Sequence, residues 1–222
     1  MNILIVAATR QEIEPLLSKM DFCEQKFSHF FECRHNNNEI TIHLTGVGMV
    51  ITAIKTLYAL SNHDYDLVFN AGICGSFNRN LEIGTVVNVV DDCFSELGAE
   101  DGEEFLSLSE LGLDDGTAIY FDSSREGIDN YILNLLPKVN GITVNTVHGN
   151  EKSIDKVVSR FHPMVETMEG AAFMLACSTH FMPYAQIRSV SNYVERRNKD
   201  NWNIPLAIEN LNKKVMEILN AF

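Results

Sequence analysis

The stretch NILIVAATRQEIEPLLSKM, Asn2–Met20, decides the fold class. It opens with NILIVAA, an almost unbroken apolar run of the kind found in strands that are buried on both faces. The residues that follow place Ile13, Leu16 and Met20 at helical spacing. A strand that leads directly into a helix is the first half of an α/β unit, so we expect a sheet covered by helices.

The rest of the chain continues this alternation. Segments 27–35 and 39–45 flank the polar tract Asn36–Asn38 and predict a β-hairpin. Further strands are expected at 66–72, 84–90, 141–149 and 184–190, and helices at 49–62, 125–136, 150–160, 165–181 and from Pro205 to the end. We therefore predict an α/β fold, a single domain over residues 1–222 with a central mixed, mostly parallel sheet flanked by helices.

Composition and charge narrow the range of partners. The 222 residues are 45% apolar, which is enough for one globular core, and the formal net charge is −13. Such a charge repels phosphate backbones and anionic lipid, so we expect neither a nucleic-acid nor a membrane partner. No apolar stretch approaches the length of a membrane span, and the start lacks a basic leader region. We expect a cytoplasmic protein.

The cysteines and histidines do not form a recognisable metal motif. The five cysteines are odd in number and include no C-x-x-C pair, so neither a disulfide framework nor a zinc ribbon is expected. The seven histidines show no H-E-x-x-H companion, and we expect no metal and no cofactor. Segment 91–104 holds seven acids in fourteen residues and predicts an exposed or mobile loop, because like charges repel in a packed element.

Three polar or glycine-containing stretches follow predicted strands: TGVGMV (45–50), NAGICGS (70–76) and IRSVSN (187–192). The carboxyl ends of parallel strands are where ligands gather. Glycines such as Gly46, Gly48 and Gly72 let a ligand approach the backbone closely. Tight turns would explain each loop equally well, and neither glycine loop matches a Walker A or dinucleotide fingerprint.

Two carboxylates each allow two interpretations. Glu12 completes an S/T-x-x-E capping box with Thr9, a role worth about 1 kcal/mol, yet a carboxylate in this first helical turn can also serve as a general base. Glu169 lies among small residues in a predicted buried helix and needs a partner. An ion pair with Arg188 or Arg160 is the first expectation, and the vicinal hydroxyls of a sugar are the second.

Taken in order, MNILIVAATRQEIEPLL, TGVGMV, NAGICGSF, VETMEGAA and IRSVSN resemble the purine nucleoside phosphorylase and nucleosidase superfamily over nearly the whole chain. The chain is most similar to the methylthioadenosine/S-adenosylhomocysteine nucleosidase branch. Within it, segment 187–208 resembles the futalosine hydrolase family of the menaquinone pathway. The resemblance implies a small nucleoside substrate and a homodimer or higher homo-oligomer.

Carried over residue by residue, the resemblance makes Glu12 the base that activates water. It places Met168 and Glu169 against the ribose, and the loops Gly46–Gly48 and Ala71–Gly75, including Gly72, on the ribose and water side. The phosphorylases carry a phosphate-binding arginine where this chain has Asn70. This difference favours water over phosphate as the nucleophile.

Asn192 carries the substrate prediction. The adenine-releasing nucleosidases have an aspartic acid at this position, which can protonate the departing base. An amide cannot supply that proton, but it can donate hydrogen bonds to the 6-oxo group and nitrogen 7 of hypoxanthine. The resemblance therefore implies hydrolysis of futalosine to hypoxanthine, with Glu12 and Asn192 as catalytic residues.

Alternatives stay open at this point. The chain could release adenine from methylthioadenosine, S-adenosylhomocysteine or aminodeoxyfutalosine, act as a phosphorylase, or bind nucleosides without catalysis. In place of the usual base-stacking aromatic it has HGNEKS (148–153). Candidate substitutes are Phe77, Phe94 and Tyr193, and candidate partners for a benzoate tail are Lys152, Arg196 and Arg197.

Overall fold

The computed structural model describes residues 1–113, 120–123 and 128–222. Within them, ten strands form one mixed sheet in the order β11-β10-β6-β12-β5-β1-β4-β3-β2, with β9 beside β6. Their bounds are β1 Asn2–Ala7, β2 Phe22–Phe27, β3 Phe30–His35, β4 Asn38–Leu44, β5 Leu67–Ser76, β6 Val86–Cys93, β9 Tyr120–Asp122, β10 Lys138–Thr143, β11 Val165–Thr167 and β12 Tyr184–Tyr193. Strands β7 (Gly98–Asp101) and β8 (Glu104–Ser107) form a separate hairpin.

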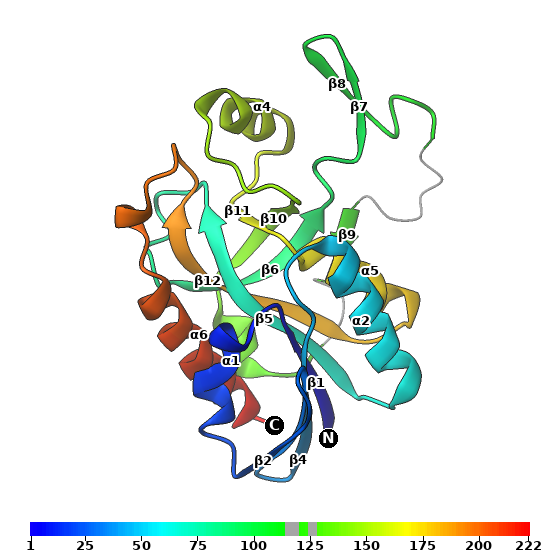
Figure 1. Cartoon of the computed structure of the whole chain (residues 1–222), viewed down its shortest axis with the longest axis vertical. Helices are drawn as coiled ribbons and strands as arrows, with labels where there is room; N and C mark the ends of the chain where they lie inside the picture. The colour runs from blue at the N-terminus through cyan, green and yellow to red at the C-terminus, as the bar shows by residue number, and fades with distance from the viewer. Residues whose placement is uncertain (114–119, 124–127) are drawn as a thin grey trace.

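Helices cover both faces of the sheet, which confirms the predicted α/β architecture. Their bounds are α1 Arg10–Leu17, α2 Met49–Asn62, α3 Tyr131–Leu135, α4 Glu151–Phe161, α5 Gly170–Thr179 and α6 Ile204–Leu219, with a short 3-10 helix at Lys199–Asn201. Helices α1 and α6 pack side by side on one face, and α2 and α5 pack together on the other (Figure 1). Among the described residues, no helix is long and apolar enough to cross a membrane.

Strand β1 is buried on both faces, as its apolar run predicts. Ile3 and Ile5 join the core beneath α1 and α6, whereas Leu4 and Val6 join the core beneath α5. All four side chains are inaccessible to solvent. Each contributes about 1.5–3 kcal/mol by leaving water, so the strand fixes the centre of the sheet.

The strand directions bring several carboxyl ends to one edge. Strand β1 runs parallel to both β4 and β5, and β5 runs parallel to β12. Strand β11 pairs with both β10 and β5, which closes β5, β12, β6, β10 and β11 into a ring. Side chains at the ends of β1, β5, β11 and β12 can therefore face a common space.

Several predicted elements have different bounds in the structure. Strand β5 continues to Ser76, so Asn70–Ser76 is strand rather than a glycine loop. Segment 165–167 is strand β11, and helix α5 begins only at Gly170. Helix α3 covers only Tyr131–Leu135; residues 128–130 are not helical, and 125–127 lie outside the described residues. The predicted strand 141–149 is β10 at Lys138–Thr143.

The acidic segment 91–104 is largely exposed, as expected, but most of it is strand rather than loop, and one of its seven acids is buried. Strand β6 extends to Cys93, and β7 and β8 form a hairpin from Gly98 to Ser107. Asp92 is 2% exposed. Local charge density does not reveal which face of a strand a residue occupies, and the alternation of β6 turns Asp92 inward.

The sequence indicated no disulfide framework, and the described residues contain a single disulfide. Cys23 and Cys33 form a disulfide across β2 and β3, where the strand register places them opposite each other. The prediction used only the number and motifs of the cysteines. The pairing depends on strand β2, which the sequence pattern did not predict.

Candidate functional site

A cavity of about 380 Å³ lies at the sheet edge where these strand ends meet. Four predicted site residues line it, namely Glu12, Met168, Glu169 and Asn192. The other lining residues are Ala8, Thr9, Gln11, Val47, Ile73, Cys74, Gly75, Val147, His148, Glu166, Thr167, Ser191, Arg197, Trp202, Ile204 and Ile208. The cavity thus combines residues from the first turn of α1, from β5, β11 and β12, and from the start of α6.

Glu12 is 7% exposed and uses its two carboxylate oxygens differently. Oε2 accepts a hydrogen bond from the Thr9 backbone N–H at 2.9 Å, which completes the predicted capping box. Oε1 accepts from the Ile73 N–H at 3.2 Å. The cap therefore leaves Oε1 facing strand β5 and the cavity, so the structural role and a catalytic role are compatible.

Glu169 lies at the N-cap of α5 and is 5% exposed. Its Oε1 accepts a hydrogen bond from the Gly48 N–H at 3.1 Å, and its Oε2 lies 3.8 Å from Nη1 of Arg188. The ion pair expected from the sequence is present, although it is too long for a hydrogen bond. Burial raises the pKa of Glu169, and the Arg188 guanidinium opposes that shift.

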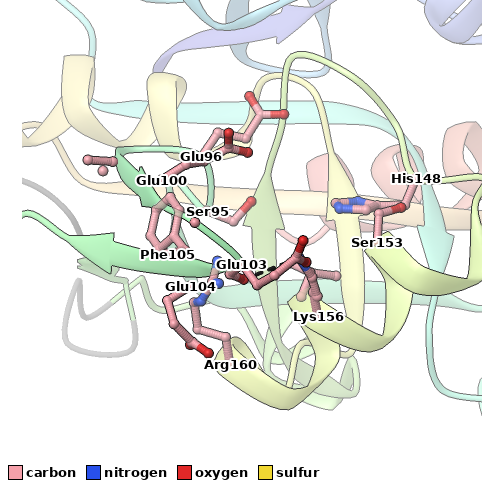
Figure 2. A pocket seen from close by; sticks show the side chains of 14 residues that line it. Ser95, Glu96, Glu100, Glu103, Glu104, Phe105, His148, Ser153, Lys156 and Arg160 are labelled. Atoms are coloured by element: carbon pink, nitrogen blue, oxygen red, sulfur yellow. Dashed lines mark hydrogen bonds and ion pairs between the residues drawn. The ribbon is translucent and has the colours of Figure 1, made fainter.

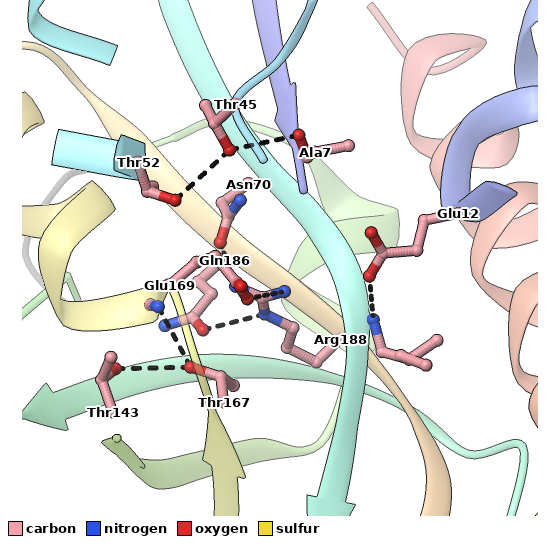
Figure 3. A network of polar contacts seen from close by, with 12 residues as sticks. Ala7, Glu12, Thr45, Thr52, Asn70, Thr143, Thr167, Glu169, Gln186 and Arg188 are labelled. Carbon is pink, nitrogen blue, oxygen red and sulfur yellow. Dashed lines mark hydrogen bonds and ion pairs between the residues drawn. The ribbon is translucent and has the colours of Figure 1, made fainter. Parts of the chain in front are cut away.

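Arg188 is fully buried at the centre of a polar network (Figure 3). Its Nε donates to Oε1 of Gln186 at 3.0 Å, and its Nη2 donates to Oδ1 of Asn70. The region around Asn70 therefore does contain a cation, because Arg188 approaches Asn70 from the neighbouring strand. The sequence argument considered Arg188 only as a partner for Glu169.

Nη1 of Arg188 has no hydrogen-bond partner among the described residues. A Cβ on Gly72 would collide with Nη1 and would lie 2.9 Å from Oε1 of Glu12. Gly72 thus allows the Arg188 guanidinium to pass close to the backbone of β5, near the Glu12 carboxylate. A buried donor without a partner is costly, so the surroundings of Nη1 suit a small polar molecule.

The network continues through Asp92. Gln186 donates from Nε2 to Oδ2 of Asp92 at 2.9 Å, and Thr143 donates from Oγ1 to Oδ1 at 2.9 Å. Thr143 Oγ1 in turn accepts from the Ala171 N–H at 2.7 Å, in the first turn of α5. Burial raises the pKa of Asp92 to about 6, although these hydrogen bonds favour the charged form.

Asn192 has a defined amide orientation. Its Nδ2 donates to the Tyr193 carbonyl at 3.0 Å, and its Oδ1 accepts from Oγ of Ser191 at 2.8 Å. Because a carbonyl can only accept, the NH₂ group must face Tyr193 and the oxygen must face Ser191. A second N–H of the amide is left for a ligand, and it offers a donor rather than an acceptor.

Comparisons with known proteins identify the family. The Phosphorylase superfamily profile matches residues 2–221. The chain belongs to the phosphorylase superfamily. It is 33% identical to a futalosine hydrolase of Acidothermus cellulolyticus, over 94% of this chain and 86% of the relative. It is 25% identical to a 5'-methylthioadenosine/S-adenosylhomocysteine nucleosidase of Glaesserella parasuis, over the full length of both chains.

A solved structure shares the fold of this phosphorylase-superfamily chain. The native structure of futalosine hydrolase of Helicobacter pylori strain 26695 superposes with a TM-score of 0.84. The alignment covers 100% of this chain and 98% of the other, at 18% identity. At that identity the likeness shows the fold alone, namely the nucleoside phosphorylase-like α/β fold.

Four residues predicted for the ribose side of this superfamily site, Gly46, Gly48, Ala71 and Gly72, are not among the lining residues of the cavity. Ala71 is fully buried in the core, and Gly72 lies behind Glu12 and Arg188. Gly46 has φ 92° and turns the chain toward Gly48, whose φ is 109°; only glycine adopts these values readily. Gly48 contributes its backbone N–H to Glu169.

The cavity also contains residues that the sequence argument missed or placed elsewhere. Phe77, Phe94 and Tyr193 are not among its lining residues, whereas Trp202 is, with the Arg197 guanidinium 4.9 Å from its ring centroid. Of the cations considered for a substrate tail, Arg197 lines the cavity. Trp202 had a signal in the sequence, because it is the only tryptophan of the chain.

A second cavity, of about 330 Å³, lies between the β7–β8 hairpin and α4 (Figure 2). In this space Nζ of Lys156 lies 3.3 Å from Oε2 of Glu103, and the Arg160 guanidinium lies 4.0 Å from the ring centroid of Phe105. Neither Glu12 nor Glu169 lines it. His148 borders both cavities, so this space adjoins the candidate site without containing its carboxylates.

Proposed function

We propose that the chain hydrolyses the N-glycosidic bond of futalosine and releases hypoxanthine and dehypoxanthine futalosine. The observation that carries the proposal is the convergence of Oε1 of Glu12 and the unpartnered Nη1 of Arg188 at Gly72. Oε2 of Glu169 lies 3.8 Å from the same Nη1. This arrangement suits a water molecule beside a nucleoside.

Glu12 acts as the general base in this proposal. A water held by Oε1 of Glu12 and Nη1 of Arg188 loses a proton to the carboxylate as it attacks the ribosyl carbon. Such general-base assistance contributes about 10² to 10⁴-fold to the rate. A phosphate nucleophile is disfavoured, because the two negative charges of Glu12 and Glu169 exceed the single positive charge of Arg188 beside them.

Glu169 holds the ribose hydroxyls, and Met168 packs against the sugar. Oε1 of Glu169 is oriented by the Gly48 N–H, which fixes the carboxylate at the cavity wall. Two vicinal hydroxyls can both donate to one carboxylate. Holding the sugar beside the water in this way makes the attack effectively intramolecular.

Asn192 determines the base in this proposal. Its second amide N–H donates to a 6-oxopurine, on which negative charge collects as the glycosidic bond breaks. The Ser191 hydroxyl and the Tyr193 carbonyl hold the amide with its donor side free. The relatives named futalosine hydrolase support the same substrate.

The alternative is release of adenine from methylthioadenosine, S-adenosylhomocysteine or aminodeoxyfutalosine. A relative named 5'-methylthioadenosine/S-adenosylhomocysteine nucleosidase matches the full length of the chain and supports it. The Asn192 amide argues against this alternative. It offers a hydrogen-bond donor, whereas the 6-amino group of adenine needs an acceptor.

The test is a product assay with futalosine, aminodeoxyfutalosine and methylthioadenosine in phosphate-free buffer, with the released base followed by chromatography. Hypoxanthine from futalosine alone is the expected result. Adenine from either amino substrate would move the assignment to the alternative. Turnover that requires added phosphate would exclude hydrolysis, and saturable binding of futalosine without base release would establish a non-catalytic binding protein.

We further propose that the chain assembles as a homo-oligomer through α2. Val50, Ile54 and Tyr58 lie four residues apart on one face of this helix and are 71%, 57% and 65% exposed. Val47, which lines the active cavity, is 55% exposed beside them. A second copy on this apolar face would also cover the mouth of the site.

A further inference from the structure

A buried histidine–carboxylate pair lies in the cavity wall and has no role in the reaction described above. Nδ1 of His148 lies 2.7 Å from Oε2 of Glu166, and the His148 backbone N–H donates to Oε1 at 3.0 Å. The Glu166 side chain is 4% exposed and that of His148 is 15% exposed. Both residues line the candidate cavity.

The pair lies beside Asn192. A Cβ on Gly75 would lie 3.4 Å from Nδ2 of Asn192 and 3.6 Å from Cγ of Glu166. The Asn192 amide and the Glu166 side chain therefore both lie close to Gly75. Asn192, Glu166 and His148 also line the same cavity, so a base recognised by Asn192 would lie close to the pair.

The chemistry of Asn192 leaves one requirement unmet. When the glycosidic bond breaks, its electron pair passes to the purine, which then needs a proton to leave as a neutral base. The Asn192 amide can donate a hydrogen bond but cannot transfer a proton at any relevant pH. Another group in the cavity must supply it.

We propose that His148, oriented by Glu166, is the proton donor to the departing purine. This inference rests on the proposed function. Glu166 accepts from Nδ1, which commits that nitrogen to a donor role and leaves Nε2 for the ligand. Among the described residues, Nε2 of His148 has no hydrogen-bond partner in the protein. The imidazole and the Phe77 ring pack edge to face, with their centroids 6.3 Å apart.

The proton balance of the reaction then closes. Water attacks the ribosyl carbon and gives one proton to Glu12, while the bond to the purine nitrogen breaks. The protonated His148 gives its Nε2 proton to a purine ring nitrogen. Exchange with solvent restores both groups, so the net reaction adds one water across the glycosidic bond.

The test compares leaving groups that need a proton with leaving groups that do not. Wild type, His148→Gln and Glu166→Gln are assayed with futalosine, with para-nitrophenyl riboside and with an N7-methylated purine nucleoside. The para-nitrophenyl riboside releases a stable phenolate, and the N7-methylated nucleoside carries a base that is already cationic. Neither leaving group needs a proton from the protein. His180→Gln, on the far end of α5, is the matched histidine control.

We expect His148→Gln to lower kcat for futalosine by about 10² to 10³-fold and to lower kcat for the activated ribosides by less than about tenfold. Glu166→Gln should show the same selectivity with a smaller loss, and His180→Gln should change neither rate. An equal loss on all substrates, or no loss on any, would overturn the role of His148. If wild type itself releases no base from futalosine, the proposed function fails instead, and methylthioadenosine, whose adenine also needs a proton to leave, takes the place of futalosine in the comparison.

Discussion

Glu12 caps helix α1 and is the proposed general base, and a single substitution can separate these two roles. Glutamine at the third helical position preserves a capping box, since its amide oxygen can still accept from the Thr9 N–H. It cannot take a proton from water. We therefore expect Glu12→Gln to lower kcat by about 10² to 10⁴-fold while the midpoint of thermal unfolding changes little. Undiminished turnover would sink the general-base role, and Glu12→Ala serves as the control that removes cap and base together.

Asn192 makes a prediction about selectivity rather than rate. The Ser191 hydroxyl and the Tyr193 carbonyl fix which amide atom faces each of them, so aspartate at this position replaces a free donor by an acceptor. We expect Asn192→Asp to shift the ratio of kcat/KM from futalosine toward its 6-amino analogue by about 10² to 10⁴-fold. Competition between the two substrates, read by chromatography, measures the ratio. A ratio that stays constant would remove Asn192 from base recognition.

At the level of elements, strand β6 buries a carboxyl group whose titration should be visible in stability. The pKa of Asp92 is raised to about 6 by burial, against 3.8 for the ordinary side chain. The native state therefore binds more protons than the unfolded state between these values, and stability falls as pH rises from about 4 to about 6. The shift corresponds to about 3 kcal/mol at most.

Asp92→Asn removes this titration, and its unfolding free energy should lack that part of the pH dependence. Urea unfolding of both proteins at pH 4 and at pH 6.5 measures the difference. We expect the unfolding free energy of the wild type to fall relative to that of the variant as pH rises from 4 to 6.5. This change does not depend on which of the two proteins is more stable at pH 4. A difference that is independent of pH would show that Asp92 does not titrate there.

The elements also show what the sequence could and could not predict. Strand β1, helices α2 and α4 and the N-terminal cap of α1 follow from apolar periodicity and capping residues, which are local signals. Helix α5 was predicted to start too early, because the three-residue segment 165–167 is too short for its pattern to distinguish strand from helix. Burial of Asp92 depends on strand pairing, which no local pattern contains.

Some residues of the candidate site could likewise be predicted from local motifs, and others could not. Glu12, Glu169 and Asn192 carry motif signals, and the structure brings them to one cavity. The central position of Arg188 could not be predicted, because it depends on the register that places Arg188 opposite Gly72 on the parallel strand β5. The pairing of His148 with Glu166 likewise joins the loop after β10 to the neighbouring strand β11. Contacts between strands that are distant in the sequence therefore could not be predicted from local patterns.

At the scale of the whole molecule, the apolar face of α2 makes the last prediction. Burying Val50, Ile54 and Tyr58 would contribute at most about 1.5–3 kcal/mol for each side chain, so this face is the apolar surface that a second copy would cover. We expect wild type to sediment as a homo-oligomer at micromolar concentration and Ile54→Glu to sediment as a monomer. Leu135→Glu, on α3 and 76% exposed, is the matched control and should leave the assembly intact.

The assembly should also affect the reaction, because Val47 lies both in the active cavity and beside the apolar face of α2. If a second copy covers the mouth of the site, Ile54→Glu should raise KM for the nucleoside with a smaller effect on kcat, since Glu12 and Arg188 keep their positions in the core of each chain. Steady-state kinetics over a range of enzyme concentrations tests this link. A monomeric variant with wild-type KM would show that each chain closes its own site, and a monomeric wild type would remove α2 as an interface.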